Sequence, residues 1–409
     1  MCCKCSSFNG IEKRPKLQFH DANGQLFPAW KQYRFDMLYK PVSEKNNLSY
    51  GVESIISVAN MYFKPDARIS DPEYLRTYNI FKYGDIAFEG NKSKSYANGR
   101  FVENTIGDGI VSHVFNVLRP LSPIHNLEYW KYAINNENVM GRILARCTKK
   151  TTMMTNLVTS DFMEQEICCP VESEQEKIAL FLSLIEKRLI AQEQLVEHLK
   201  KYKRGVVKTL LDPKQNQHQG VIWKTDAIGN LGTFIKGAAL SKADISDFGT
   251  PFILYGELYT TYKEVVRSIV RTTQASVDDV HLSKVGDVVI PTSGETPEEI
   301  STASCIMVPN VILAGDLNIY RSTIVDGRIM SYLLNHIVNE QIARVAQGKS
   351  VVHVQASEVG KIPITYPDHN EQERIAQILE LIDNRIAVSE KALNSMQMMK
   401  KALLQQLFI

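Results

Sequence analysis

The stretch Glu174-Gln-Glu-Lys-Ile-Ala-Leu-Phe-Leu-Ser-Leu-Ile185 is the most informative part of this chain, because a close copy of it follows later. The copy reads Glu371-Gln-Glu-Arg-Ile-Ala-Gln-Ile-Leu-Glu-Leu-Ile382, about 197 residues further on, and the two align without a gap. A proline precedes each stretch, at Pro170 and Pro367, and each opens a segment of about 40 residues. A repeat of this kind indicates a chain built from two related halves with an internal two-fold.

Both segments are predicted to be long amphipathic helices, since large apolar residues recur in steps of three and four. Ser173 and Asn370 are the expected N-caps. We expect the helices to pair as an antiparallel coiled coil; the alternative is that each packs only against its own domain. The expected seam consists of Ile178, Leu182, Ile185, Leu189, Val196 and Leu199 in the first helix and Ile375, Leu379, Ile382, Ile386, Leu393 and Met396 in the second. Lys203 and Lys400 interrupt this seam at matching positions.

Two mixed domains are predicted around these helices, so the fold class is mixed α/β (α+β). The turn signals Gly84-Asp85 and Gly286-Asp287 each precede an apolar strand pattern, which extends the repeat beyond the helices. Residues 126–145 are predicted to be helical. The expected order is a loose arm (1–25), a first domain (26–170), a helix (171–212), a linker (213–220), a second domain (221–367) and a helix (368–409).

Composition gives few further constraints. The 409 residues carry a net charge of only +2, so the total charge does not by itself indicate a nucleic-acid binder. No apolar run is long enough for a membrane helix or a secretory signal, which favours a cytoplasmic location. The seven cysteines fit no standard zinc pattern and are interpreted as reduced thiols; a metal-binding tail at Cys2, Cys3 and Cys5 is the alternative.

Motifs for catalysis are missing from the sequence. There is no adenine-methylation motif, no glycine-rich turn for a methyl-donor cofactor and no phosphate-binding loop. Gly348-Lys349-Ser350 lacks the upstream glycine of such a loop. We therefore expect a chain that is not catalytic by itself and that holds no metal or cofactor.

Two similar domains held apart by a rigid helical spacer would suit a reader of two DNA half-sites. Polar and basic loops after the Gly-Asp strands supply the candidate contacts, with asparagine suited to base edges and lysine to phosphates. The alternative for each lysine is an ordinary solvated surface. The candidates are Asn91, Lys92, Lys94, Arg146, Lys149 and Lys150 in the first domain and Lys236, Thr292, Ser293, Arg344 and Lys349 in the second.

The chain resembles the specificity (S) subunit of type I restriction–modification enzymes over about residues 25–409. The resemblance rests on the repeated proline and Glu-Gln-x-x-Ile-Ala pattern, the two Gly-Asp turns, and Gly348-Lys-Ser-Val-Val-His353. The first domain departs from it, with Thr151 in place of Gly348. The N-terminal arm with its cysteines is also outside the family pattern.

This resemblance implies two target recognition domains, each reading one half of an asymmetric bipartite site in double-stranded DNA. It also implies helices that set the spacing and dock two modification (methyltransferase) subunits. Those partners would bind S-adenosylmethionine and methylate adenine, and a further ATP- and Mg-dependent restriction subunit would cleave DNA. Two other functions stay open: a self-associating scaffold that only organises partners, and an enzyme in its own right.

Overall fold

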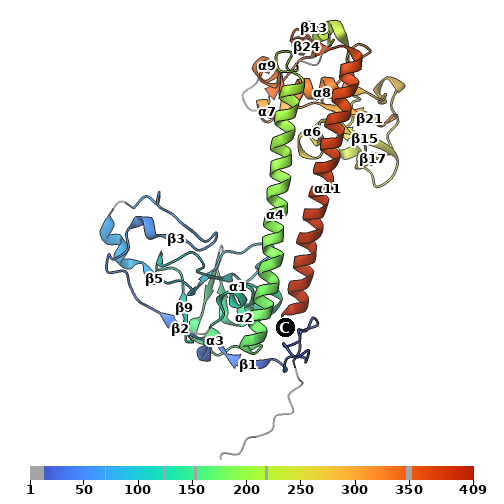
Figure 1. Ribbon diagram of the computed structural model, residues 1–409. Helices are drawn as coiled ribbons and strands as arrows, with labels where there is room; N and C mark the ends of the chain where they lie inside the picture. The colour runs from blue at the N-terminus through green and yellow to red at the C-terminus, as the bar shows by residue number, and fades with distance from the viewer. Residues whose placement is uncertain (1–12, 70, 123–124, 152–153, 217–219, 347–351) are drawn as a thin grey trace, which may run out of the picture. The chain divides into compact units, whose positions relative to one another are not determined.

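The computed structural model describes residues 13–69, 71–122, 125–151, 154–216, 220–346 and 352–409. Its contacts divide the chain into two compact units. Unit 1 comprises Met1–Gln192 with Ala392–Ile409, and unit 2 comprises Glu193–Lys391. Each unit holds one mixed domain and part of each of two long helices, α4 (Glu172–Leu210) and α11 (His369–Leu407) (Figure 1).

Unit 1 is built on a four-stranded antiparallel sheet. Its strands, in spatial order, are β2 (Tyr39–Val42), β9 (Val117–Pro120), β6 (Ile86–Glu89) and β7 (Arg100–Glu103). Four strand pairs surround it: β1 (Lys31–Arg34) with β12 (Glu166–Cys169), β3 (Ile56–Ser57) with β4 (Tyr62–Phe63), β5 (Asn79–Phe81) with β8 (Gly109–Val111), and β10 (Thr148–Lys150) with β11 (Thr155–Leu157). The short helices of its domain are α1 (Leu127–Ala133), α2 (Glu137–Cys147) and α3 (Thr159–Met163), with 3-10 turns at Phe35–Met37, Val52–Ser54 and Pro72–Thr77.

Unit 2 has a five-stranded sheet. Its strands, in spatial order, are β14 (Gly232–Lys236), β22 (Leu317–Ser322), β18 (Asp287–Pro291), β20 (Ser304–Ile306) and β16 (Val265–Val266). Smaller sheets are formed by β17 (Arg271–Thr273), β15 (Thr250–Leu254) and β21 (Ile312–Ala314), by β13 (Trp223–Ala227) with β24 (Pro363–Pro367), and by β19 (Ser293–Gly294) with β23 (Val352–His353). Its short helices are α5 (Ile228–Leu231), α6 (Glu257–Thr260), α7 (Pro297–Ile300), α8 (Gly327–His336), α9 (Asn339–Val345) and α10 (Ala356–Val359), with 3-10 turns at Lys242–Asp244 and Asp279–His281.

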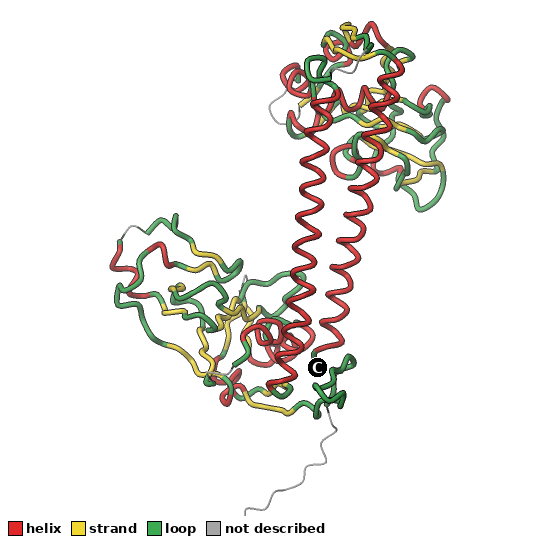
Figure 2. Tube along the Cα trace, viewed as in Figure 1, coloured by secondary structure: helices red, strands yellow, loops and turns green. Residues whose placement is uncertain are grey.

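The two units repeat one topology, which confirms that the repeat extends beyond the long helices. The strand order β2-β9-β6-β7 of unit 1 recurs as β14-β22-β18-β20 in unit 2. The antiparallel pair β1–β12, which leads into α4, recurs as β13–β24, which leads into α11. Figure 2 shows the same mixture of strands, loops and short helices beside the long helices in each unit.

The long helices run antiparallel within each unit, as predicted. In unit 1, Ile178 near the start of α4 shares a buried cluster with Leu407 at the end of α11. In unit 2, Val207 near the end of α4 shares one with Ile375 near the start of α11. Every residue of the expected seam is buried or half-buried. Both clusters also contain side chains of the adjoining domain, so each helix packs against its twin and against its own domain.

The repeated sequence motif has a structural explanation. The Nε2 of Gln175 donates to the carbonyl of Pro170 at 3.1 Å, and Gln372 does the same for Pro367 at 2.9 Å. The glutamine therefore ties the first turn of each helix to the proline that precedes it. The isoleucine and alanine of the motif are buried in both copies, as Ile178, Ala179, Ile375 and Ala376.

Three local predictions are wrong. α4 begins at Glu172, so Ser173 lies inside its first turn and is no cap. Asp368 rather than Asn370 caps α11, since its Oδ1 accepts from the amides of residues 370 and 371 at 3.1 and 3.3 Å. The helix expected at 126–145 is two helices, because Asn136 caps α2 through the amide of Asn138, at 3.0 Å.

Residues 13–25 are anchored rather than loose. The amide of Leu17 donates to the carbonyl of Gln406 at 3.1 Å, and the rings of Phe19 and Phe181 meet edge to face, with centroids 5.6 Å apart. Apolar side chains in the segment pack onto the core of unit 1 and overcome its polar composition. The terminal cysteines, Cys2, Cys3 and Cys5, lie outside the described residues.

Candidate nucleic-acid interface

The Gly-Asp turns position the central strand of each sheet. In unit 1, Gly84 has a φ of +86°, and Asp85 after it accepts two hydrogen bonds from the Arg119 guanidinium on β9, both at 2.8 Å. In unit 2, Arg321 on β22 makes the same bidentate contact with Asp287, at 3.0 Å for the closest pair of atoms. These buried carboxylates therefore fix the strands whose far ends carry the candidate loops.

The loop after β6 is fastened to a segment about 60 residues away in sequence. The amide of Thr155 donates to the carbonyl of Gly90 at 2.8 Å, and Asn91 forms a β-bridge with Met154. A Cβ at Gly90 would lie 2.1 Å from the Thr155 carbonyl oxygen, so only glycine permits this approach. The Asn91 side chain is exposed beside the β10–β11 hairpin.

This contact brings together two groups of candidates that the sequence keeps apart. The Nζ of Lys92 donates to the carbonyl of Thr151 at 2.9 Å, directly after β10, which carries Lys149 and Lys150. All three lysine side chains are exposed. We call the set Asn91, Lys92, Lys149 and Lys150 surface 1. It combines one amide suited to base edges with three cations suited to phosphates.

The other two candidates of unit 1 lie elsewhere. Arg146 is exposed in the last turn of α2. Lys94 lines a separate cavity of about 760 Å³, together with Lys131 and Tyr132. That cavity is distinct from surface 1, since none of the residues of surface 1 lines it.

Unit 2 repeats the loop connection with different side chains. The amide of Val354 donates to the carbonyl of Thr292 at 3.0 Å, just as Thr155 donates to Gly90. Next to it, β19 pairs with β23, so that Ser293 faces His353. The main-chain bonds are the same in both units, but the side chains differ. Equivalent loops of the two units therefore present different side chains to solvent.

A cavity of about 880 Å³ opens beside this loop. Lys236 and Thr292, both expected from the sequence, line it. Four further exposed polar residues line it that were not expected: Asp316, His353, Gln355 and Ser357. We call these six residues surface 2. Apart from half-buried Thr292, they are exposed, and their mixture of donors and acceptors suits base edges better than phosphates.

The remaining candidates of unit 2 are placed differently. Ser293 is 4% exposed, and its hydroxyl donates to Asp316 at 2.7 Å, so it supports Asp316 instead of facing solvent. Arg344 is exposed on α9, with a Glu340 carboxylate 3.6 Å away. Lys349 lies outside the described residues.

Among the unexpected members of surface 2, only His353 belongs to a motif that can be recognised in the sequence. Residues 348–353 stand out as a motif, and His353 ends it, but nothing marks their pairing with Ser293. Asp316 carries no signal at all, because it lies in the turn between β21 and β22 and reaches the site only through the fold.

The described residues form neither a metal site nor a membrane-spanning helix. They contain no group of three or more histidine, cysteine, aspartate or glutamate side chains placed to hold a metal ion. None of the helices formed by these residues is long and apolar enough to cross a membrane.

One family model matches part of the chain. Residues 221–397 match the family model described as "Type I restriction modification DNA specificity domain". No curated protein matches the chain. Among solved structures, the S subunit of a type I restriction–modification system from M. genitalium is similar, with a TM-score of 0.56 and 18% identity over 97% of this chain and 99% of that one.

A second similar structure comes from work on complex assembly and conformational transition of the type I R-M system. It has a TM-score of 0.58 and 15% identity, over 92% of this chain and 95% of that one. At these identities, the likeness concerns the fold of the whole chain, including both units and both long helices.

Proposed function

We propose that each unit reads one half of a split DNA site. Two premises support this proposal: residues 221–397 belong to the type I restriction–modification DNA specificity family, and the whole chain has the fold of an S subunit. The observation that carries this proposal is the repeated loop connection with unlike side chains. One connection presents Asn91 and Lys92, and the other presents the polar cavity of surface 2.

The chemistry of the two surfaces favours two different readouts. Surface 1 has three exposed lysines, which contribute binding energy through phosphates and make binding sensitive to salt. Surface 2 has an exposed carboxylate, Asp316. Phosphates would repel this group, and it is suited to accept a hydrogen bond from the amino group of cytosine. Two unlike half-sites follow from this difference.

Docking of methyltransferase subunits is the second part of the proposal. Large apolar side chains are exposed on the long helices at matching positions of the repeat: Leu184 at 56% with Leu381 at 71%, and Tyr202 at 61% with Met399 at 51%. Exposed apolar side chains that recur at matching positions of both long helices suit a surface that a partner covers. We infer that each helix offers one such surface, so that two partner subunits bind, and that the partners carry the S-adenosylmethionine, ATP and Mg.

The proposal is tested with the complex of the full chain and its methyltransferase subunit, binding DNA duplexes in which either half-site is scrambled. In one variant Asn91 and Lys92 become alanine, and in the other Lys236 and Gln355 do. Each pair of substitutions is expected to remove discrimination at one half-site only, by about tenfold or more, since a good base contact is worth about 1 to 3 kcal/mol. Lys16→Ala, at an exposed lysine of the anchored N-terminal segment, is the control.

Equal loss at both half-sites, or no loss, would contradict the assignment of the two surfaces. Binding without any sequence preference would favour the scaffold instead. The isolated chain is also incubated with S-adenosylmethionine and the same duplexes; methyl transfer without the partner would show that it is an enzyme in its own right.

A further inference from the structure

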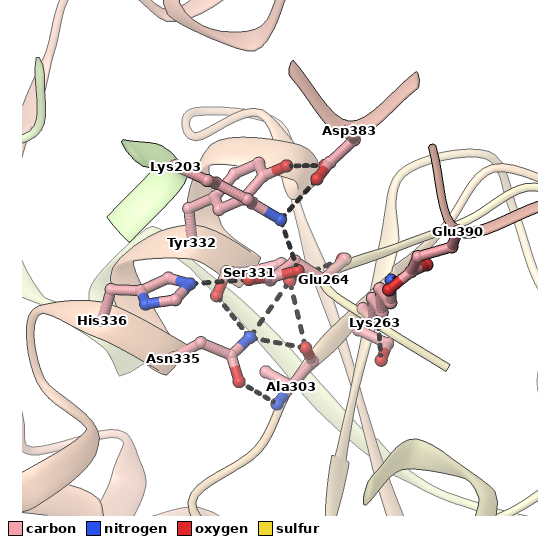
Figure 3. Close-up of polar contacts among 11 residues, drawn as sticks. Lys203, Lys263, Glu264, Ala303, Ser331, Tyr332, Asn335, His336, Asp383 and Glu390 are labelled. Atoms are coloured by element: carbon pink, nitrogen blue, oxygen red, sulfur yellow. Dashed lines mark hydrogen bonds and ion pairs between the residues drawn. The ribbon is translucent and has the colours of Figure 1, made fainter. Parts of the chain in front are cut away.

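Two lysines interrupt the apolar seam of the long helices, and each contacts a carboxylate on the other long helix and a tyrosine ring of the adjoining domain. The Lys203 cluster consists of Lys203, Asp383, Tyr332, Glu264 and His336, all in unit 2 (Figure 3). The Lys400 cluster consists of Lys400, Glu186 and Tyr132, all in unit 1. In the aligned repeat, Lys203 corresponds to Lys400 and Asp383 to Glu186.

The Lys203 cluster ties three parts of unit 2 together. Lys203 on α4 is 7% exposed, and its Nζ lies 2.6 Å from Asp383 on α11 and 2.8 Å from Glu264, just before β16. Tyr332 on α8 donates its hydroxyl to Asp383, and its ring centroid lies 5.0 Å from the Lys203 Nζ. His336 Nε2 lies 2.6 Å from the other Glu264 oxygen. The buried cation thus joins one long helix to the other and both to the domain.

The Lys400 cluster repeats this arrangement with the helices exchanged. Here the lysine comes from α11 and its carboxylate partner, Glu186, from α4. The tyrosine again comes from the domain: Tyr132 lies on α1, with its ring centroid 6.0 Å from the Lys400 Nζ. An arrangement that occurs twice in one chain, at matching positions of a diverged repeat, points to a shared role.

An apolar heptad seam alone does not fix how far one helix has slid along the other. A shift of one heptad replaces each apolar contact by a similar one. It moves one helix along the other by about 10 Å, which is the length of about three base pairs of DNA. Buried polar residues in such seams contribute little net stability, but they specify register, because a wrong register leaves a charge buried without its partner.

The surroundings of Lys203 show what a shifted register would cost. Sliding by one heptad in one direction would place Lys203 opposite Ala376, which offers no charge. Sliding in the other direction would place it opposite Glu390, which is already paired with Lys200 at 3.1 Å and Lys263 at 3.0 Å. In both cases Lys203 would leave Glu264, which would remain buried with His336 alone.

We propose that the Lys203 and Lys400 clusters set the register of the helix pair and lock each domain to it, and so fix the distance between the two DNA half-sites that the complex accepts. This inference rests on the proposed function. It makes Lys203 and Lys400 positioning residues for spacing, without any contact with DNA.

The Lys400 cluster offers the cleaner test, because Glu186 is partly exposed and its carboxylate stays hydrated when the lysine is lost. The full chain in complex with its methyltransferase subunit is given duplexes that carry both half-sites. Their spacer is either the natural length or differs from it by one to three base pairs. We expect Lys400→Met to lower the preference for the natural spacer by about tenfold, or 1.4 kcal/mol, while each half-site sequence is still required.

The double variant Glu186→Lys with Lys400→Glu restores the ion pair and is expected to restore the preference. Lys401→Met, at the exposed neighbour on the same helix, should behave as wild type. An unchanged spacer preference in Lys400→Met, or no recovery in the double variant, would overturn the inference while leaving the proposed function intact. A wild-type complex that ignores both half-sites would instead overturn the proposed function, and the inference with it.

Discussion

At the scale of single residues, Glu103 of unit 1 carries a buried carboxyl group. Its side chain lies at the end of β7 and is 4% exposed, and neither of its oxygens has a hydrogen-bond partner among the described residues. Its pKa is raised to about 9, mainly by burial and also by the charge of Glu128, while the charge of Lys131 acts in the opposite direction. The folded unit therefore holds this group protonated at neutral pH.

A folded-state pKa above the unfolded value costs stability as pH rises. Below about pH 4.5 Glu103 is protonated in both the folded and the unfolded chain, and the free energy of unfolding is unaffected. Between there and pH 9 the unfolded chain loses this proton first, so the free energy of unfolding falls progressively. Glu103→Gln keeps the shape of the side chain but cannot ionise in the unfolded chain. It should therefore stabilise unit 1 by about 1 to 3 kcal/mol at pH 7 to 8 and have no effect below pH 4.5. Hydrogen exchange of unit 1 amides at both pH values measures this. Glu164→Gln, at an exposed carboxylate, is the control, and an equal gain at both pH values would refute the titration of Glu103.

At the scale of elements, α4 and α11 present two apolar faces with separate roles. The inward face carries the seam, whose residues are buried or half-buried, and the outward face carries Leu184 and Leu381 at 56% and 71% exposure. Because these two leucines occupy the same position of the repeat and contribute nothing to the seam, they are the natural pair for testing the partner surface.

Leu184→Ser with Leu381→Ser is expected to weaken binding of the methyltransferase subunit by about tenfold or more and to leave the helix content and thermal unfolding of the chain unchanged. Titration calorimetry with the purified partner gives the affinity. Lys187→Ser, at an exposed polar position of α4, should bind as wild type. Full affinity in the double variant would place the partner on another surface.

At the scale of the whole molecule, the two units share a topology but differ in the side chains of their loops. Cells that carry the chain and its partners should therefore methylate adenine in a split motif with two unlike halves. Genome-wide mapping is expected to show that alanine at Asn91 and Lys92 relaxes one half and that alanine at Lys236 and Gln355 relaxes the other. A single continuous motif, or the same half affected by both variants, would contradict one recognition surface per unit.

The sequence by itself determined the architecture. Heptad spacing, the repeated motif after Pro170 and Pro367, and the Gly-Asp turns are local patterns that depend on backbone periodicity, and they predicted the paired helices and the internal repeat. They could not locate the helix caps, because neighbouring polar residues such as Asp368, Asn370 and Ser173 compete for the same backbone amides.

Only the tertiary structure decided which polar residues face solvent and which act inside the protein. In the sequence Ser293 looks like a surface residue and Lys203 is only an interruption of the apolar seam, yet both are buried beside a carboxylate. Loops distant in sequence meet through a few hydrogen bonds, such as Thr155 to Gly90, which leave no periodic pattern in the sequence. Burial and hydrogen-bond partners depend on contacts between distant segments, and local patterns carry no information about those contacts.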